Sequence, residues 1–414
     1  MLVLLSDGAG LTARQCATLL ARAGHQVEAL SPDRLCLCRL TRHVRAVHRV
    51  PALGEDPFGW LEAALDIAAR RRADLLLPVQ EQVTVMSLAR DRIDAAGLLT
   101  AVPDFGALAQ VQDKVSAYRT LARVGVPQPP AVVATTAAEL QAAADLPAFV
   151  KTPIGTASAG VRRVTSTAEL RQLAAEAERE GTFATDGVLV QQPVRGPLVM
   201  VQSVFAHGEL VAFHACRRVR EGAGGGASHK LSVDLPEARE HIAALGAALR
   251  WHGALSADLI LGADRPRFID VNPRLVEPVN AFLSGVDLVG TLVEVARAGT
   301  SRPRPPGRPG TRTHQLLLAV LGAAQHGGRR DIARELQDAA LRRGDYSDSR
   351  EELTPGRGDL LAGFPVAMTA VATLARPTAW QYFTGGSVGA YSLTPGAWHE
   401  LRARATARSG TRGG

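Results

Sequence analysis

Two carboxylates, one carboxamide and one guanidinium could meet on a single face of a β-hairpin. The segment SADLILGADRPRFIDVNPR, residues 256–274, reads as two strands joined by a short turn. Asp258 and Asp270 are equally far from the centre of that turn, so we expect them to lie opposite one another. Because side chains alternate along a strand, Asn272 and Arg274 should share the face of Asp270.

Oxygen ligands of this kind suit Mg²⁺, which takes few protein ligands and fills its other positions with water and phosphate. The sequence therefore predicts a magnesium site formed by Asp258, Asp270 and Asn272, with Arg274 at its edge. The alternative is a structural hairpin whose polar side chains face water. Pro273 argues against that alternative, because proline removes a backbone hydrogen-bond donor from the strand.

Lysine is rare in this chain, and each of its positions therefore invites an explanation. Lysine and arginine together number 47, but only Lys114, Lys151 and Lys230 are lysines. The lysine ammonium is compact and makes point contacts to phosphate oxygens, whereas the planar guanidinium needs more room. For each lysine taken alone, the alternative is an ordinary surface position.

Lys151 has the neighbourhood of a phosphate-binding lysine. It ends a strand-like run and precedes TPIGTASAG, residues 152–160. A loop of small residues with free backbone amides can form an anion-binding concavity, and hydroxyl groups add donors. We expect Gly155, Thr156 and Ser158 to contact phosphate together with Lys151.

The other two lysines are less clearly placed. Lys230 ends a second glycine-rich segment, EGAGGGASHK, residues 221–230. This segment is either a mobile flap that closes a lysine over phosphate or a disordered loop with an incidental lysine. Lys114 begins a predicted helix, where the helix dipole disfavours a cation, so its position indicates a role other than helix stability.

The elements that would position these residues divide the chain into three regions. Residues 1–108 alternate strands and helices, which predicts an α/β domain with a Rossmann-like parallel sheet. Residues 109–300 are richer in strands, with a hairpin turning at His207–Gly208. Residues 301–414 begin with the proline-rich SRPRPPGRPG, continue as a mostly helical extension and end in a predicted frayed tail at 403–414.

Composition and charge narrow the function classes. The chain is 46% hydrophobic and 21% charged, as in folded soluble proteins. Its formal charge of +7 is spread over many arginines, so a polyanionic cofactor explains it as well as nucleic acid does. The longest apolar run, residues 360–375, is interrupted by glycine and proline and is too short to span a bilayer comfortably. We expect neither a nucleic acid nor a membrane as partner.

The four cysteines do not have the spacing of a structural zinc site. Cys36 and Cys38 alternate in the strand-like run DRLCLCRL, so we expect both thiols to be buried on one face of a strand. No disulfide framework is implied, which fits a reducing cytoplasm.

The order of the motifs resembles the ATP-grasp superfamily over about residues 1–300. The motifs are DK with GVPQP, then FVKTPIGTASAGV, LVQQPVRG, an acid on a strand before FIDVNPR, and SGVDL. The chain is most similar to the carboxylate–amine ligase and carbamoyl-phosphate-synthase-like branch. The resemblance implies an ATP-grasp domain at 109–300, with two α+β subdomains around the nucleotide, after a pre-ATP-grasp domain at 1–108.

The resemblance also implies that ATP and Mg²⁺ are the cofactors. Two lysines would bind ATP, the QQPV segment would contact adenine through its backbone, and the hairpin acids would hold Mg²⁺. The residues concerned are Lys114, Lys151, Gln191, Gln192, Val194, Asp258, Asp270, Asn272 and Arg274. Two positions differ from the family pattern: Gln192 stands where a glutamate is usual, and Leu198 lies near the usual position of the glutamate that holds the ribose.

The implied reaction activates a carboxylate as an acyl phosphate, which an amine attacks, releasing ADP and phosphate. Arg274 and Lys230 would act in catalysis, with His229 and His252 as further candidates for handling the proton of the amine. Isolated histidines are more often structural.

Substrates are expected to be a small carboxylate and an amine, such as amino acids or peptides, and a homodimer is an open alternative to a monomer. Glu81, Arg220 and Glu277 are candidate substrate contacts. Arg217 and Arg218 could join Arg220 in holding a second carboxylate, or the three could form a solvated basic strand. Two other functions remain open: a nucleotide-binding scaffold or sensor without turnover, and a carboxyl-phosphate enzyme like carbamoyl-phosphate synthase or biotin carboxylase.

Overall fold

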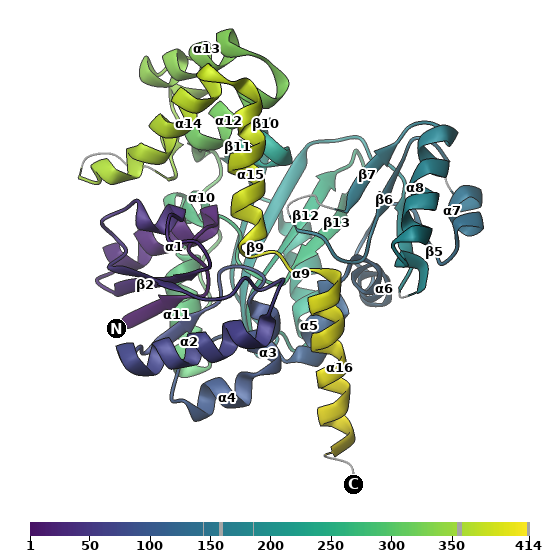
Figure 1. The fold of residues 1–414 in the computed structure, drawn as a ribbon, viewed down its shortest axis with the longest axis horizontal. Coiled ribbons are helices and arrows are strands. Elements are labelled where there is room, and N and C mark those ends of the chain that lie inside the picture. The colour runs from purple at the N-terminus through teal and green to yellow at the C-terminus, as the bar shows by residue number, and fades with distance from the viewer. Residues whose placement is uncertain (144, 157–159, 185, 354–357, 412–414) are drawn as a thin grey trace.

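Three β-sheets organise the protein, as the computed structural model shows (Figure 1). The structure describes residues 1–143, 145–156, 160–184, 186–353 and 358–411. A parallel sheet lies at the N-terminal side, a seven-stranded sheet in the centre, and a small antiparallel sheet on the opposite side. The expected combination of an α/β region followed by α+β regions is confirmed.

The first sheet contains four parallel strands in the order β3-β2-β1-β4. Three of its strands are largely buried on both faces, as parallel strands usually are, and the edge strand Ala46–Arg49 is partly exposed. The strands are β1 (Leu2–Leu5), β2 (Gln26–Ser31), β3 (Ala46–Arg49) and β4 (Leu75–Leu77). The helices of this region are α1 (Leu11–Arg22), α2 (Pro57–Arg71), α3 (Val83–Leu88) and α4 (Arg90–Ala95). Asp7 and Glu81 follow β1 and β4, so they lie at the edge where parallel-sheet proteins commonly bind ligands.

The small antiparallel sheet belongs to a lid subdomain, residues 131–191, with strand order β5-β8-β6-β7. Its elements are β5 (Ala131–Ala134), α7 (Ala137–Ala143), β6 (Ala148–Lys151), β7 (Val161–Val164), α8 (Thr167–Arg179) and β8 (Val188–Gln191). Val150 and Val188 pack on the helix side. Alternation therefore turns Lys151 and Gln191 to the other face.

The seven-stranded sheet has the order β13-β12-β9-β10-β11-β14-β15, and only its β14–β15 pair is parallel. Its strands are β9 (Leu198–Ala206), β10 (Glu209–Glu221), β11 (Ala227–Ser232), β12 (Gly253–Leu261), β13 (Pro266–Asn272), β14 (Arg312–His314) and β15 (Arg350–Glu351). The hairpin predicted at His207–Gly208 is confirmed, and both turn residues have positive φ, 50° and 99°. Two positive φ values are typical of a tight turn that matches the twist of the strands.

Five further helices lie between Phe105 and Ala298. They are α5 (Phe105–Gln112), α6 (Lys114–Val124), α9 (Pro236–Ala248), α10 (Val279–Ser284) and α11 (Leu288–Ala298). Leu292 and Val295 of α11 share one core with Val204 of β9 and with Leu20 of α1. The first domain and the central sheet are thus joined by continuous apolar packing.

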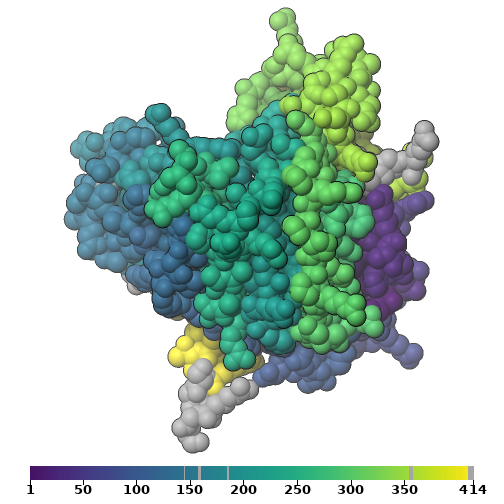
Figure 2. Space-filling view, turned by 180° about the vertical axis from the view of Figure 1, so that it is seen from behind, coloured from purple at the N-terminus to yellow at the C-terminus, as the bar shows by residue number. Residues whose placement is uncertain are grey.

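The segment after residue 301 is built into the fold rather than appended to it. Strands β14 and β15 extend the central sheet, and Arg304 and Gly310 donate backbone hydrogen bonds to Val211 and Ser232. In Figure 2 the green segment around residue 300 covers the boundary between the central sheet and the first domain. The helices that follow are α12 (Leu316–His326), α13 (Arg329–Ala340), α14 (Phe364–Ala375), α15 (Trp380–Gly389) and α16 (Pro395–Thr411).

Three local predictions are wrong. Cys36 and Cys38 are buried as expected, but they lie at a 3-10 turn (Leu37–Arg39), not in a strand. The expected loop at 221–230 becomes β11 from Ala227 onward, because β10 and β14 supply hydrogen-bonding partners on both sides. Most of the expected frayed tail is helical, since α16 continues to Thr411.

Among the described residues, none of the helices combines the length and the apolar character that a bilayer span requires.

Candidate active site

The β12–β13 hairpin places two carboxylates directly opposite one another. Asp258 pairs with Asp270, and Ser256 pairs with Asn272, which is the register expected from the sequence. Burial raises the pKa of Asp258 to about 7, and the neighbouring Asp270 carboxylate adds to this increase. A β-bulge follows Asp258, a feature that often re-aims a side chain beside a functional site.

The donor set of this hairpin fits Mg²⁺. It offers two carboxylates and one carboxamide, all oxygen donors. Within the described residues, no group of three or more histidine, cysteine or acidic side chains could hold a metal ion. A metal here would therefore need further oxygens from water or phosphate, which is the usual habit of Mg²⁺. Two neighbouring carboxylates repel one another when both are ionised, and a divalent cation bound between them would offset that repulsion.

Lys151 reaches from the lid subdomain toward this hairpin. Its side chain is buried at the end of β6, and Nζ donates a hydrogen bond of 2.7 Å to the carbonyl oxygen of Ile269 in β13. Burial lowers the pKa of Lys151 to about 8, whereas Asp270 and Asp258 oppose that shift. Lys151, Asp258, Asp270 and Asn272 are called the hairpin site below.

Lys114 and the glycine-containing loop lie beside the hairpin site. Lys114 begins α6, and its Nζ donates a 3.0 Å hydrogen bond to the carbonyl oxygen of Gly155. Its charge also lowers the pKa of Lys151, so the two ammonium groups are close. Thr156 is buried at 7% exposure, and Ser158 lies outside the described residues. Asp113 caps α6 by accepting from the Ser116 amide, which fixes where the helix begins.

The predicted adenine-contacting segment follows β8. Gln191 is buried at the end of that strand, and Gln192 and Val194 are half-buried just beyond it. The Gln192 amide donates to the carbonyl oxygen of Pro130 at 2.9 Å, and its side chain donates to that of Asp145 at 3.2 Å. These contacts hold the segment against the lid subdomain.

Arg274 forms a buried ion pair with Glu81. Arg274 Nε and Glu81 Oε1 are 3.1 Å apart, and Gln112 Nε2 donates to the other carboxylate oxygen at 3.1 Å. Glu81 comes from the end of the first sheet, so the pair joins two domains. The sequence predicts that Glu81 contacts the substrate and that Arg274 acts in catalysis, and the structure brings the two side chains into contact.

Lys230 lies in a buried charge cluster on β11. Its side chain is 2% exposed and contacts the carboxylates of Glu277 and Glu352, the latter at 2.7 Å. Gln315 Nε2 donates to the same two carboxylates. Glu277 has a φ of 42°, an uncommon conformation for a residue with a side chain and one often found at functional sites. Lys230, Glu277, Glu352 and Gln315 are called the Lys230 cluster below.

Two residues of the centre were missed by sequence reasoning. Asp7 is buried after β1, where its carboxylate accepts from the Ala9 and Gly10 amides at 3.1 and 2.7 Å. Burial raises the pKa of Asp7 to about 6. Its position after an apolar first strand, in SDGAG, was a usable signal. Tyr391 follows α15 and is 9% exposed, and its electrostatic neighbours are Arg274, Asp7, Glu81 and Glu277. Nothing in the local sequence marks Tyr391.

The C-terminal segment also approaches the glycine-containing loop. A pocket of about 460 Å³ is lined by Gly155 and Thr156 on one side and by Val388 and Thr394 on another. Thr394 Oγ1 donates to the carbonyl oxygen of Gly54 at 2.8 Å, which anchors this segment to the first domain. The segment that leads to α16 therefore lies between the first domain and the lid subdomain.

Several candidates lie away from this centre. Arg220 pairs with Glu335 and contacts Tyr346 instead. His229 packs edge-on against Tyr346, and burial lowers its pKa to about 3. His252 stacks on His207 with ring centroids 4.2 Å apart, and burial lowers its pKa to about 4.

The two neighbours of Arg220 differ from it. Arg218 donates to the carbonyl oxygen of Gly225 at 2.7 Å and lowers the pKa of Asp258. Arg217 lies next to it on β10, opposite Val199. The three arginines thus do not gather at one point.

Residues 111–278 match the family model of the ATP-grasp domain. Pyruvate carboxylase of Bacillus subtilis is 25% identical over 259 residues, a match that covers 58% of this chain and 23% of that enzyme. The chain thus spans less than a quarter of the length of this curated relative.

Solved structures with the same fold include several enzymes. The biotin carboxylase domain of 2-oxoglutarate carboxylase from Hydrogenobacter thermophilus, solved with MgADP, ADP and bicarbonate, has a TM-score of 0.59 and 17% identity, covering 75% of this chain and 73% of that one. N5-carboxyaminoimidazole synthetase from Staphylococcus aureus has a TM-score of 0.59 and 13% identity, covering 82% and 85%. L-amino acid ligase from Bacillus licheniformis has a TM-score of 0.53 and 17% identity, covering 73% and 77%.

Proposed function

Because residues 111–278 match the family model of the ATP-grasp domain, we propose that this protein is an ATP- and Mg²⁺-dependent ligase that joins a carboxylate to an amine. The carboxylate is activated as an acyl phosphate, and ADP and phosphate are released. The names of the similar structures support this class, since they include an amino acid ligase and enzymes named for carboxylation.

One observation supports the proposal most directly. Asp258 and Asp270 face each other, and Lys151 reaches from the lid subdomain to the same strand. This arrangement gathers a lysine and a cation-binding carboxylate pair at one point, as the terminal phosphates of a magnesium nucleotide require. Bound Mg²⁺ would neutralise charge on the phosphates.

The residues of this chain bind and orient the reactants. Lys151 and Lys114 would neutralise the polyphosphate, and Arg274 would stabilise the transferred phosphoryl group. A carboxylate oxygen of the substrate attacks the γ-phosphorus, and the bond from phosphorus to ADP breaks. The amine nitrogen then attacks the acyl carbon, loses a proton, and phosphate leaves. Glu277 follows Arg274 closely in the sequence and is proposed to contact the amine, with Lys230 holding the Glu277 carboxylate in place.

A second candidate differs only in the acid. The sequence match to pyruvate carboxylase favours bicarbonate, which would form carboxyl phosphate in the same way. Because bicarbonate carries no ammonium group, Glu277 and Glu81 would then not be needed to bind one.

The products of the reaction test the proposal. We expect ADP and phosphate to form with Mg-ATP when amino acids, short peptides or bicarbonate are supplied singly and in pairs. Hydroxylamine should trap an activated amino acid or peptide as a hydroxamate. Formation of AMP and pyrophosphate would contradict the mechanism. Tight ATP binding without turnover of any acid would instead support a nucleotide-binding sensor.

The matched variants are Asp270→Asn and Asp264→Asn. Both remove one carboxylate from the same hairpin, but Asp264 lies in the exposed turn and pairs with Arg267. Only Asp270→Asn should abolish acid-dependent ADP release. Equal activity of both variants would remove the hairpin site from the mechanism.

A further inference from the structure

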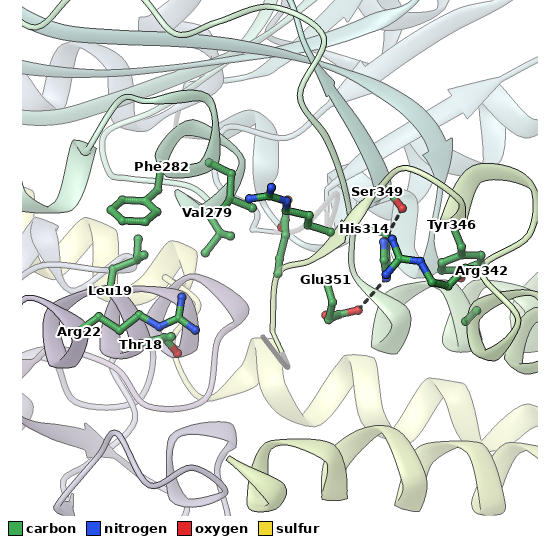
Figure 3. A pocket seen from close by; sticks show the side chains of 14 residues that line it. Thr18, Leu19, Arg22, Val279, Phe282, His314, Arg342, Tyr346, Ser349 and Glu351 are labelled. Carbon is green, nitrogen blue, oxygen red and sulfur yellow. Dashed lines mark hydrogen bonds and ion pairs between the residues drawn. The ribbon is translucent and has the colours of Figure 1, made fainter. Parts of the chain in front are cut away.

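A second pocket lies outside the hairpin site, between the first domain and the C-terminal region (Figure 3). It has a volume of about 500 Å³, which is within the range of small-molecule sites. Its walls come from α1, α10, β14 and the segment from Ala339 to Glu352. None of the four residues of the hairpin site lines it.

One end of this pocket is apolar. Leu19 and Phe282 lie close together there, with Val279 beside them (Figure 3). Phe282 is 38% exposed although it is large and apolar. Covering a partly exposed aromatic side chain with an apolar group removes apolar surface from water, which favours binding of that group.

The pocket is also rich in arginine. Arg22, Arg342 and Arg350 all line it. Within the described residues none of the three has a carboxylate within salt-bridge distance, and Arg342 donates only to the carbonyl oxygen of Ser347 at 3.3 Å. Arg312, two residues before His314, is by contrast paired with Asp348. Guanidinium groups that line a pocket and lack an acidic partner favour an anionic ligand.

The remaining polar groups of the pocket are already satisfied. His314 Nδ1 and Ser349 Oγ are 2.6 Å apart, and His314 Nε2 lies 3.4 Å from Glu351. Burial lowers the pKa of His314 to about 4, so the ring is uncharged at neutral pH. Glu351 also accepts the backbone amides of Leu316 and Leu353. Glu351 therefore keeps its negative charge, and the three arginines outnumber it among the charged groups that line the pocket.

Glu352 separates this pocket from the catalytic centre. It lines the pocket, yet its carboxylate is directed to Lys230 at 2.7 Å and to Gln15 at 2.9 Å. Thr313 Oγ1 donates to its other oxygen at 2.6 Å. The Glu352 carboxylate would therefore lie between a ligand in the pocket and Lys230, and the ligand would not contact Arg274.

We propose that this pocket is a second ligand site, for a small carboxylate with an apolar side chain. The apolar group packs on Leu19 and Phe282, and the carboxylate pairs with the arginines. The site is distinct from the one that activates the substrate carboxylate, and it requires no assumption about the reaction.

Binding of 3-phenylpropanoate, measured by titration calorimetry on the full chain, tests the proposal. This probe has one carboxylate and one apolar ring, and 3-phenylpropanamide is its uncharged counterpart. We expect saturable binding of the acid with a Kd of about 1 mM or below. The amide should bind about tenfold more weakly or worse, because a charge-assisted pair is lost.

Two exposed positions locate the site. Arg22→Gln and Phe282→Ala should each weaken binding of the acid by about fivefold or more. Arg330→Gln, an exposed arginine on α13 outside the pocket, should leave it unchanged. Because Arg22 and Phe282 are not fully buried, these changes should not prevent folding.

The proposal is overturned by any of three results. They are no saturable binding of the acid up to about 10 mM, equal binding of acid and amide, and wild-type affinity in both pocket variants. Weakened binding in Arg22→Gln and Phe282→Ala with unchanged Arg330→Gln supports it.

Discussion

The hairpin site and the Lys230 cluster are both buried and charged, but their charges are balanced in opposite ways. In the hairpin site Asp258 and Asp270 face each other, and Lys151 donates to a backbone carbonyl rather than to either carboxylate. In the Lys230 cluster the ammonium contacts two carboxylates directly. The first arrangement leaves negative charge for a bound cation, whereas the second satisfies its charges within the protein.

This difference predicts which property each site controls. A group whose charge is neutralised only by a bound ligand contributes little to the stability of the free protein. A group that neutralises a buried partner contributes a great deal, because removing it leaves an uncompensated charge. Variants of the two sites should therefore separate turnover from stability.

The largest effect is expected at the hairpin site. Asp270→Asn should lower Mg-ATP turnover by about 100-fold or more, because several kcal/mol of metal-dependent stabilisation are lost. The free energy of unfolding, measured with urea, should stay within about 1 kcal/mol of the wild type. A variant that loses stability instead of turnover would show that the two carboxylates are structural.

The Lys230 cluster should respond in stability. Lys230→Met leaves Glu277 and Glu352 buried without their cation and should lower the free energy of unfolding by about 3–5 kcal/mol. Lys114→Met is the control, since Lys114 is half-buried and its Nζ donates to a backbone carbonyl. It should cost about 1 kcal/mol or less. Equal stability of both variants would contradict the comparison, and a loss of turnover alone would make Lys230 purely catalytic.

The pH dependence of Mg²⁺ binding should distinguish the sites further. Burial and Asp270 raise the pKa of Asp258 to about 7, so this carboxyl is protonated below that pH in the metal-free protein. Mg²⁺ must displace the proton, and its affinity should fall about tenfold for each pH unit below 7. Titrations at pH 5.5, 6.5 and 7.5 would check this slope.

Lys230 should not add to that pH dependence. Although burial alone would lower its pKa, Glu277 and Glu352 raise it, so the ammonium stays charged throughout this range. A flat Mg²⁺ affinity between pH 5.5 and 7.5 would show that Asp258 is not a ligand.

The smallest effect is expected at Tyr391, whose charged neighbours are Arg274, Asp7, Glu81 and Glu277. Tyr391→Phe removes one hydroxyl next to Arg274 and Glu277. Turnover should fall about fivefold, because a polar group worth about 1 kcal/mol is lost beside the charged groups of the centre, with unchanged ATP affinity. Tyr382→Phe is the control, because Tyr382 is 79% exposed on α15. Identical kinetics for both variants would remove Tyr391 from the site.

The same two sites show how far the sequence could lead. The pairing of Asp258 with Asp270 is expected from their equal distance to the turn, but a β-bulge between Asp258 and Leu259 determines it, since the register nearer the turn would pair Asp258 with Ile269. The fold class and the position of Lys151 at a strand end follow from local patterns.

The Lys230 cluster could not be predicted in this way. Its partners Gln315 and Glu352 come from a region that matches no recognised motif, and they meet Lys230 only through β14 and β15. The glycine-rich neighbourhood of Lys230 suggested a loop, but strand pairing on both sides overrides local flexibility. Tyr391 could not be predicted from the sequence either, because only tertiary contacts bring it near the charged groups of the site.

The late position of Glu352 in the chain has a consequence for biosynthesis. Lys230 and Glu277 leave the ribosome well before Glu352, and β14 and β15 are added to the sheet from the same late segment. Until that segment emerges, β11 is an uncovered edge strand that carries a cation without its second carboxylate. An exposed edge of this kind can pair with other chains. The nascent protein should therefore depend on chaperone protection while the segment between β11 and β15 is being synthesised.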